Sequence, residues 1–178
     1  CVIGREGSDI AAADAFDYIA GFCILNDWSA RDLQFDEMAV GLGPAKGKDA
    51  ASSLGPWLVT TDEMAPYLRN GRLRVKCTVR VNGDVWLHEG DGGAAHHSWG
   101  DFVERASKDS RIVPGDVIGS GTVSGGSIPE AIARGIDGAR YLQPGDVVEL
   151  EVEGIGMLRN TLGPKAKVDA AYRYLPKR

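Results

Sequence analysis

The sequence contains little cysteine and little histidine. Its 3 cysteines are far apart: Cys1, Cys23 and Cys77. This number and spacing exclude a disulfide framework and a CxxC metal site, and they favour a reducing compartment such as the cytoplasm. Of the 3 histidines, His96 and His97 are adjacent and directly precede a predicted helix. We therefore interpret the pair as capping and packing residues rather than as catalytic bases or metal ligands.

The sequence also lacks long apolar runs and clusters of basic residues. No apolar run approaches the roughly 18 residues that a membrane-spanning helix needs. The 20 Lys and Arg residues are scattered and the net charge is −5, which argues against nucleic acid or an anionic membrane as a partner. An apolar content of 43% with 25% charged residues is typical of a globular protein, and we expect residues 1–178 to form a single domain.

The chain does not start with Met. It opens on Cys1-Val2-Ile3-Gly4, a pattern that is typical of the inside of a strand. We therefore expect the domain to be truncated on its N-terminal side, so that any group supplied from upstream lies outside the sequence.

Glycine, in contrast, is abundant. The 24 glycines cluster between short runs of alternating polarity, which predicts a mainly β fold with a few short helices. Alternation over residues 73–81 predicts a half-buried strand, and Asn82-Gly83 predicts a hairpin turn into a second strand at 85–87. Two Pro-Gly-Asp-Val sequences, at 114–117 and 144–147, each predict a tight turn that leads directly into a strand.

Few segments have helical features. Residues 11–19 predict a short helix, which Gly21 would end before a buried strand over 22–26. The spacing of Ser98 and Asp101 is typical of a capping box and predicts the start of a second helix.

Polar residues follow the 22–26 run where packing alone would not require them. Asp27 stands at the predicted strand exit, and a carboxylate held on a rigid element suits a hard divalent cation. An ion pair between Asp27 and Arg31 on a helix surface is the alternative. Lys48 follows a Gly-rich loop that would let the backbone approach a ligand, and lysine often pairs with anionic oxygens.

A second Gly-rich run covers residues 119–126. Its spacing fits neither GxGxxG nor a P-loop, so we reject nucleotide binding. A turn with backbone donors and the Thr122 hydroxyl facing a pocket remains the expectation. Glu130 follows Pro129 at a predicted helix start, where helix capping and a functional role are both open.

Four motifs, in order along the chain, resemble the catalytic domain of the fumarylacetoacetate hydrolase family. The likeness covers nearly the whole chain and implies the family's fold, a mixed β-sandwich roll with a barrel-like core. The motifs are residues 26–34 (NDWSARDLQ), 48–57 (KDAASSLGPW), 114–122 (PGDVIGSGT) and 153–160 (EGIGMLRN).

The resemblance implies a divalent metal, Mg²⁺ with Mn²⁺ or Ca²⁺ as alternatives, held by three carboxylates. Asp27 matches one of them, and the other two belong to a Glu-x-Glu strand that is expected upstream of Cys1, together with a catalytic His. Lys48 resembles the catalytic lysine beside metal and substrate. Ser52 takes the place of a hydroxyl residue close to the metal.

The same matching implies a substrate pocket. Arg31 and Gln34 resemble the pair that lines it, and Thr122 resembles the threonine that binds a substrate carboxylate. Glu130 resembles the glutamate that orients the catalytic His. Met38 stands where fumarylacetoacetase has a tyrosine, which disfavours fumarylacetoacetate itself as the substrate.

The activity implied is metal-dependent hydrolysis of a C–C bond in small diketo or oxo acids, in the catabolism of aromatic compounds. A 2-oxo acid decarboxylase or a diene-dioate isomerase of the same family, or a catalytically inert β-rich homologue, are the alternatives. The implied partners are the small acid substrate and a second copy in a homodimer, to which some of the tryptophans would contribute: Trp28, Trp57, Trp86 and Trp99.

Overall fold

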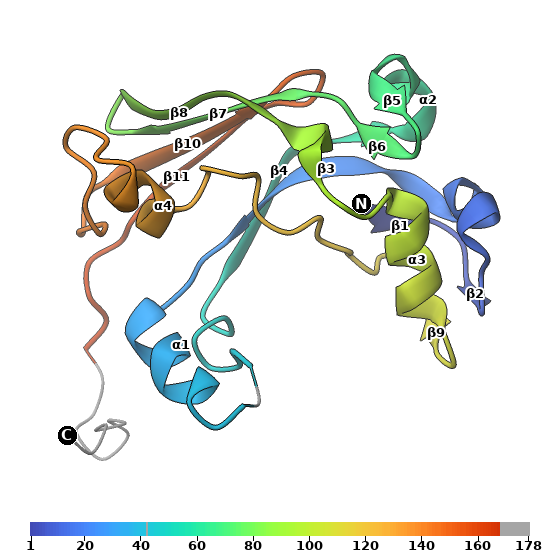
Figure 1. The fold of residues 1–178 in the computed structure, drawn as a ribbon, viewed down its shortest axis with the longest axis horizontal. Coiled ribbons are helices and arrows are strands. Elements are labelled where there is room, and N and C mark those ends of the chain that lie inside the picture. Colours follow the sequence, from blue (N-terminus) through green and yellow to red (C-terminus); the bar gives the residue numbers. More distant parts are fainter. Residues whose placement is uncertain (42, 168–178) are drawn as a thin grey trace.

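The computed structural model describes residues 1–41 and 43–167, and they form a mainly β structure with short helices (Figure 1). All paired strands are antiparallel. The strands are β1 (Val2–Ile3), β2 (Gly7–Ser8), β3 (Ile19–Asp27), β4 (Ser52–Thr60), β5 (Leu68–Arg69), β6 (Arg72–Leu73), β7 (Lys76–Val81), β8 (Asp84–Asp91), β9 (Arg111–Ile112), β10 (Val147–Val152) and β11 (Gly156–Thr161). The predicted fold class is confirmed.

The helices are short and lie around the sheets (Figure 1). The α-helices are α1 (Arg31–Met38), α2 (Thr61–Met64), α3 (Trp99–Ser107) and α4 (Ile128–Ala133). The 3-10 helices are η1 (Ala12–Asp17), η2 (Ala65–Tyr67) and η3 (Gly92–Ala94).

Two sheets enclose the main core. The larger has the strand order β11-β10-β7-β8, and the smaller has the order β1-β3-β4. β4 contacts β11 and β3 contacts β10, so the two sheets join into a partly closed roll (Figure 1). The two-stranded pairs β2-β9 and β5-β6 lie at its right-hand side in this view.

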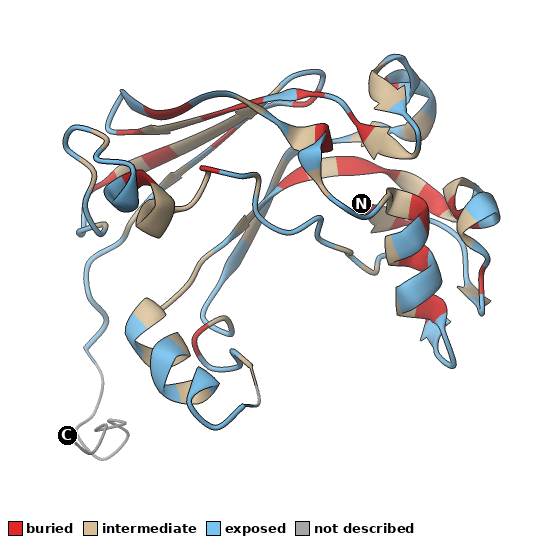
Figure 2. Cartoon of the chain, viewed as in Figure 1, coloured by how far each residue is buried: buried red, intermediate tan, exposed pale blue. Residues whose placement is uncertain are grey.

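Buried residues concentrate on the strands of the two sheets and on α3 (Figure 2). Phe22 of β3, Val103 of α3 and Leu158 of β11 belong to one cluster. The Phe22 ring packs edge-to-face on Trp99 with the ring centroids 5.1 Å apart, a favourable geometry for aromatic pairs. A smaller cluster around Trp86 includes Ala131 of α4.

The first predicted helix is only partly correct. Residues 12–17 form the 3-10 helix η1, but Ile19 already begins β3. Gly21 does not end a helix; it is a buried residue inside β3. A Cβ atom at Gly21 would collide with the carbonyl oxygen of Val59 in β4, so this glycine allows the two strands to approach closely.

The predicted hairpin and capping box are confirmed. Asn82 and Gly83 have φ angles of 53° and 89°, as a two-residue turn of type I′ requires. The strand before the turn starts at Lys76 rather than at residue 73, because Leu73 pairs with β5 instead. At α3, Ser98 Oγ accepts the N–H of Asp101 at 3.1 Å, and the Asp101 carboxylate accepts the N–H of Ser98 at 2.7 Å.

The two Pro-Gly-Asp turns have the same local geometry and different outcomes. In each, the Asp carboxylate accepts the N–H three residues earlier, Val113 at 2.8 Å for Asp116 and Gln143 at 2.7 Å for Asp146. The second turn leads into β10, as predicted. The prediction of a strand after the first turn is wrong, because Val117 makes only an isolated bridge to β1.

Asp146 also ties this turn to the β7-β8 hairpin. Its carboxylate accepts two N–H groups of Arg140, at 2.7 and 2.9 Å, and the Asn82 amide at 2.9 Å. The Arg140 guanidinium, the Asn82 amide and the Gln143 N–H hold the pKa of the Asp146 carboxyl well below its usual range.

We predict that Gly21→Ala destabilises the fold by about 1–3 kcal/mol, because the added methyl group must push β3 and β4 apart. Urea unfolding followed by circular dichroism measures the change. Gly163→Ala is the matched control, since a Cβ there meets no atom within 4 Å, and it should change stability by less than about 0.5 kcal/mol. Equal stability of the two variants would contradict the assignment.

The Asp146 network predicts a pH dependence of stability. Folding lowers the pKa of Asp146, so its stabilising effect is complete above the unfolded value of about 3.9 and is lost as the pH falls below it. Asp146→Asn should therefore lower the urea midpoint at about pH 7, and the difference from wild type should shrink between about pH 4 and 2. Asp84→Asn is an exposed change in the neighbouring hairpin. Its urea midpoint should equal that of wild type both at about pH 7 and between about pH 4 and 2.

Candidate functional site

Asp27 is the last residue of β3. The strand buries Phe22 and Ile24, and its final residue emerges at the open end with a side chain that is 48% exposed. In the antiparallel pairing Asp27 lies opposite Ser52, the first residue of β4. Directly opposed residues have side chains on the same face, so the sheet itself places a hydroxyl beside the carboxylate.

The chain between β3 and β4 carries the next two predicted residues. Lys48 Nζ donates to Asp27 Oδ2 at 2.5 Å. Arg31 begins α1 and donates to Gln34 Oε1 at 2.9 Å. The considered ion pair between Asp27 and Arg31 is therefore not formed, because Lys48 is the cation on Asp27.

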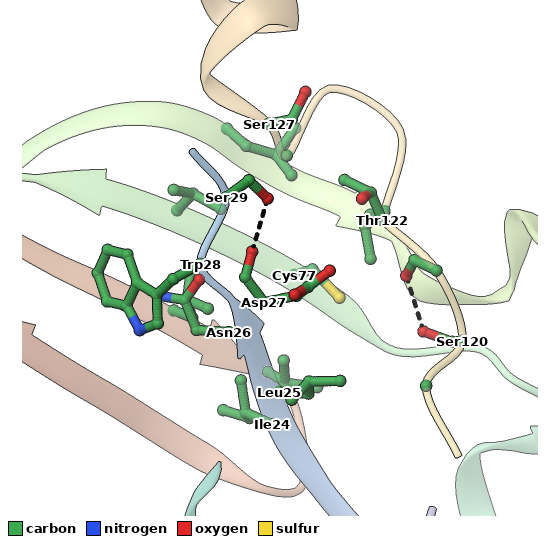
Figure 3. A pocket seen from close by; sticks show the side chains of 18 of the residues that line it. Ile24, Leu25, Asn26, Asp27, Trp28, Ser29, Cys77, Ser120, Thr122 and Ser127 are labelled. Atoms are coloured by element: carbon green, nitrogen blue, oxygen red, sulfur yellow. Dashed lines mark hydrogen bonds between the residues drawn. The ribbon is translucent and has the colours of Figure 1, made fainter. Parts of the chain in front are cut away.

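A cleft of about 1070 Å³ opens in front of Asp27, and four of the predicted site residues line it: Asp27, Arg31, Lys48 and Thr122. Thr122 belongs to an exposed loop. Figure 3 shows Asp27 on β3 pointing into the space that the loop with Ser120 and Thr122 borders. Residues that are 74 positions or more from Thr122 in the sequence thus share one cleft with it, but their roles remain predictions.

The other three predicted residues do not line this cleft. Gln34 Oε1 accepts a hydrogen bond from Arg31, and the Gln34 amide nitrogen contacts Met38 Sδ at 3.7 Å. Ser52 stands beside Asp27 in the sheet. Glu130 lies in α4, on a separate small pocket together with Leu87.

Glu130 has a clear structural use. Its Oε2 accepts the Ser127 hydroxyl at 2.6 Å and the Ser127 N–H at 3.1 Å, and its Oε1 accepts the Gly125 N–H at 3.0 Å. These bonds cap α4 and hold the pKa of Glu130 below its ordinary value, with the Ser127 hydroxyl as the largest cause. The predicted role in orienting a catalytic His stays a prediction.

Cys77 also lines the cleft, but its thiol is not activated. Burial is the main cause that raises the pKa of Cys77 to about 11. The thiolate is the nucleophilic form of cysteine, so at neutral pH this residue stays a neutral thiol. The cleft therefore does not support cysteine-based nucleophilic catalysis by Cys77.

The donor chemistry around Asp27 fits part of a site for a hard cation. Carboxylate and hydroxyl oxygens are ligands for Mg²⁺, and Asp27 offers a carboxylate at the cleft while Ser52 lies opposite it in the sheet. Within residues 1–41 and 43–167, no group of three or more His, Cys, Asp and Glu side chains is arranged to hold a metal. Asp27 would thus act as one ligand of a set completed from elsewhere.

Sequence reasoning missed two kinds of residue at this site. The apolar walls include Leu25 and Leu54, which are opposite each other in β3 and β4, and the exposed Phe35 of α1. Glu37 was missed too: its carboxylate bonds to the backbone just before Lys48. An apolar residue within a short polar segment was the signal available in the sequence for Phe35. The hydrogen bonds of Glu37 across the loop leave no such signal in the sequence.

These features agree with the comparison to known proteins. Residues 1–163 match the family described as fumarylacetoacetate hydrolase C-terminal. The chain therefore belongs to the fumarylacetoacetate hydrolase family, and the resemblance in its motifs is confirmed.

Relatives and similar solved structures differ in the reactions that their names describe. Oxaloacetate tautomerase YisK of Bacillus subtilis is 32% identical over 162 residues, which cover 91% of this chain and 49% of the relative. The structure of 5-carboxymethyl-2-hydroxymuconate delta-isomerase from Mycobacterium smegmatis has a TM-score of 0.71 at 34% identity, over 93% of this chain and 57% of that one. Fumarylacetoacetate hydrolase from Exiguobacterium antarcticum has a TM-score of 0.73 at 30% identity, over 92% and 54%.

The chain spans about half the length of the curated relatives it matches. In the part of the chain that the structure describes, no helix has the length and apolar character needed to cross a bilayer.

We predict that Asp27→Asn lowers the affinity of the full-length protein for Mg²⁺ at least about 10-fold. The reason is that a neutral amide oxygen is a weaker ligand for a hard cation than a carboxylate oxygen. Isothermal titration calorimetry with MgCl₂ measures this. Asp36→Asn removes an exposed carboxylate from α1 away from the cleft and should leave the affinity unchanged. Unchanged affinity in Asp27→Asn would show that Asp27 is not a ligand.

Proposed function

We propose that this chain forms the metal-binding part of an enzyme that converts small 2-oxo or diketo acids through an enolate. The observation that carries the proposal is the placement of Lys48 against Asp27 in a cleft that Arg31 and Thr122 also line. A carboxylate ligand, two cations and a hydroxyl at one cleft suit a substrate that is anionic and gains charge during the reaction.

Each side chain has a distinct part in this proposal. Arg31 binds the substrate carboxylate, for which a guanidinium is well suited, and the Thr122 hydroxyl donates to the same group or its neighbour. The Lys48 ammonium faces the carbonyl oxygen that becomes the enolate oxygen. Asp27 would be one of the residues that hold the divalent cation, which would supply Lewis-acid polarisation of a bound carbonyl.

The leading reaction is hydrolytic cleavage of a C–C bond. Water adds to the distal carbonyl carbon, the bond to the next carbon breaks, and the electron pair remains on the released 2-oxo acid as an enolate, which then takes up a proton. The base for the attacking water is expected upstream of Cys1. Of the 3 histidines, only His97 lines the cleft, and it lies beside Asp101 at 4.0 Å.

The second candidate is proton transfer without bond cleavage. The names of two relatives, an oxaloacetate tautomerase and a delta-isomerase, favour it. In a tautomerisation the proton moves between the enol oxygen and the carbon beside the carbonyl. In a double-bond isomerisation it moves between a remote carbon and the carbon beside the carbonyl. Both reactions need a stabilised enolate. Both candidates use Lys48 in the same way, whereas only cleavage needs an activated water.

We also propose a homodimer in the cytoplasm with Mg²⁺ as the natural metal. The 67% exposure of Trp57, next to the exposed Leu58 on β4, supports an apolar contact surface of the kind that dimers bury.

The test uses Lys48→Met in the Mg²⁺-loaded protein, with two probes. Oxaloacetate reports enol–keto interconversion by ultraviolet absorbance, and acetylpyruvate reports cleavage to acetate and pyruvate. We expect kcat on the active probe to fall on the order of 100-fold with KM within about threefold, since Lys48 acts on charge that develops in the transition state.

Lys46→Met is the matched control. Lys46 lies two residues away, its side chain is 80% exposed and it pairs with Asp49. Its replacement should leave kcat within about twofold of wild type, as expected for an exposed ion pair. Equal kcat in Lys48→Met and wild type would overturn the proposed role, and activity on neither probe would overturn the substrate class.

A further inference from the structure

The segment between β3 and β4 has little apolar packing beyond Trp28, which packs on the cluster around Trp86. α1 buries none of its residues. Among the described residues from 28 to 51, Gly47 is the only buried one, and Figure 2 shows α1 in pale blue and tan. Apolar packing therefore does little to hold Lys48 in place, and hydrogen bonds must do so.

Glu37, near the end of α1, accepts three consecutive backbone N–H groups. Its Oε2 accepts from Ala45 at 2.9 Å and from Gly47 at 3.1 Å, and its Oε1 accepts from Lys46 at 2.6 Å. These bonds, with that from Ala45 as the largest cause, hold the pKa of the Glu37 carboxyl below its ordinary value. The carboxylate therefore stays charged at neutral pH, which strengthens the three bonds.

The turn that Glu37 grips leads directly to Lys48. The Lys48 N–H donates to the carbonyl oxygen of Ala45 at 3.0 Å, so the backbone forms a tight turn. Gly47 O accepts the N–H of Ala30 at 2.8 Å, and a Cβ at Gly47 would come within 3.1 Å of Ala30 O. Gly47 thus lets the turn pack closely against the start of α1, and Glu37 bonds the turn to the end of the same helix.

The spacing within α1 gives this grip a consequence for the cleft. Arg31 is in the first turn of α1 and Glu37 is in the last, so one helix carries a substrate-facing cation and the group that fixes the turn of the other cation. A shift of the turn by about 1 Å would displace the backbone from which the Lys48 side chain reaches Asp27, while Arg31 stayed in place. Misplacement on this scale can lower the rate of a reaction by about 100-fold.

We propose that Glu37 is a positioning residue that holds the turn 45–48 on α1 and so fixes the Lys48 ammonium between Asp27 and the substrate. Its effect on rate rests on the proposed function of Lys48, but the grip itself does not. Glu37 does not line the cleft and contacts neither substrate nor metal in this proposal.

The first test is independent of activity. In Glu37→Ala, amide hydrogen exchange followed by NMR should be at least about 10-fold faster at the three gripped N–H groups, because they lose their acceptor. Exchange in β3 and β7 should not change. Asp36→Ala is the matched control, being the preceding exposed residue of α1, and it should leave all these rates as in wild type. Unchanged exchange at Ala45, Lys46 and Gly47 in Glu37→Ala would overturn the proposal.

The second test asks whether the grip acts through Lys48. Glu37→Ala should lower kcat on the active probe between about 10- and 100-fold with KM within about threefold, since Arg31 keeps its place. Glu37→Gln, which keeps one acceptor oxygen, should fall between Glu37→Ala and wild type. In a Lys48→Met background, Glu37→Ala should have no further effect on kcat.

The two tests separate the possible failures. An equal loss of kcat from Glu37→Ala in both backgrounds would mean that the residue supports the fold in general, which overturns the positioning role. If Lys48→Met leaves kcat unchanged, the proposed function fails, whereas the exchange rates still decide whether Glu37 holds the turn.

Discussion

The antiparallel pairing of β3 with β4 is the interaction on which the candidate site depends. It places Asp27 opposite Ser52 at the open end of the smaller sheet and determines where the chain leaves that sheet and where it returns. The pairing depends in turn on Gly21, because no side chain fits between the strands at that position. Gly21 thus supports the pairing near the start of β3, and a register shift between Phe22 and Ile24 separates it from the end of the strand where Asp27 lies.

The two sides of the cleft are supported by different physical means. Asp27 is on a strand whose neighbours Phe22 and Ile24 are buried, so its position is tied to the core. Lys48 and Arg31 belong to a segment that is held by hydrogen bonds to Glu37 and by the close approach of Gly47. The side of the cleft that carries Asp27 is therefore tied to the core, while the side that carries Lys48 and Arg31 depends on a few polar contacts.

Local signals in the sequence predicted the elements that local chemistry determines. The Asn82-Gly83 hairpin, the Ser98 capping box and the turn before β10 follow from residue types a few positions apart, and the structure has all three. The interpretation of Gly21 failed because its role depends on Val59, a residue distant in sequence. The grouping of Asp27, Lys48 and Thr122 followed from family resemblance, since no spacing rule predicts which loops share a cleft.

The weak attachment of the segment between β3 and β4 has an evolutionary consequence. Since Gly47 is its only buried residue among those described, replacements along α1 and its loop leave the hydrophobic core intact and carry little penalty in folding. Substrate preference can then diverge among homologues by drift in this segment, while selection for stability acts on the sheets. Residues of this segment that neither line the cleft nor hold the turn, such as Asp36, are therefore freer to vary than the residues of the sheets.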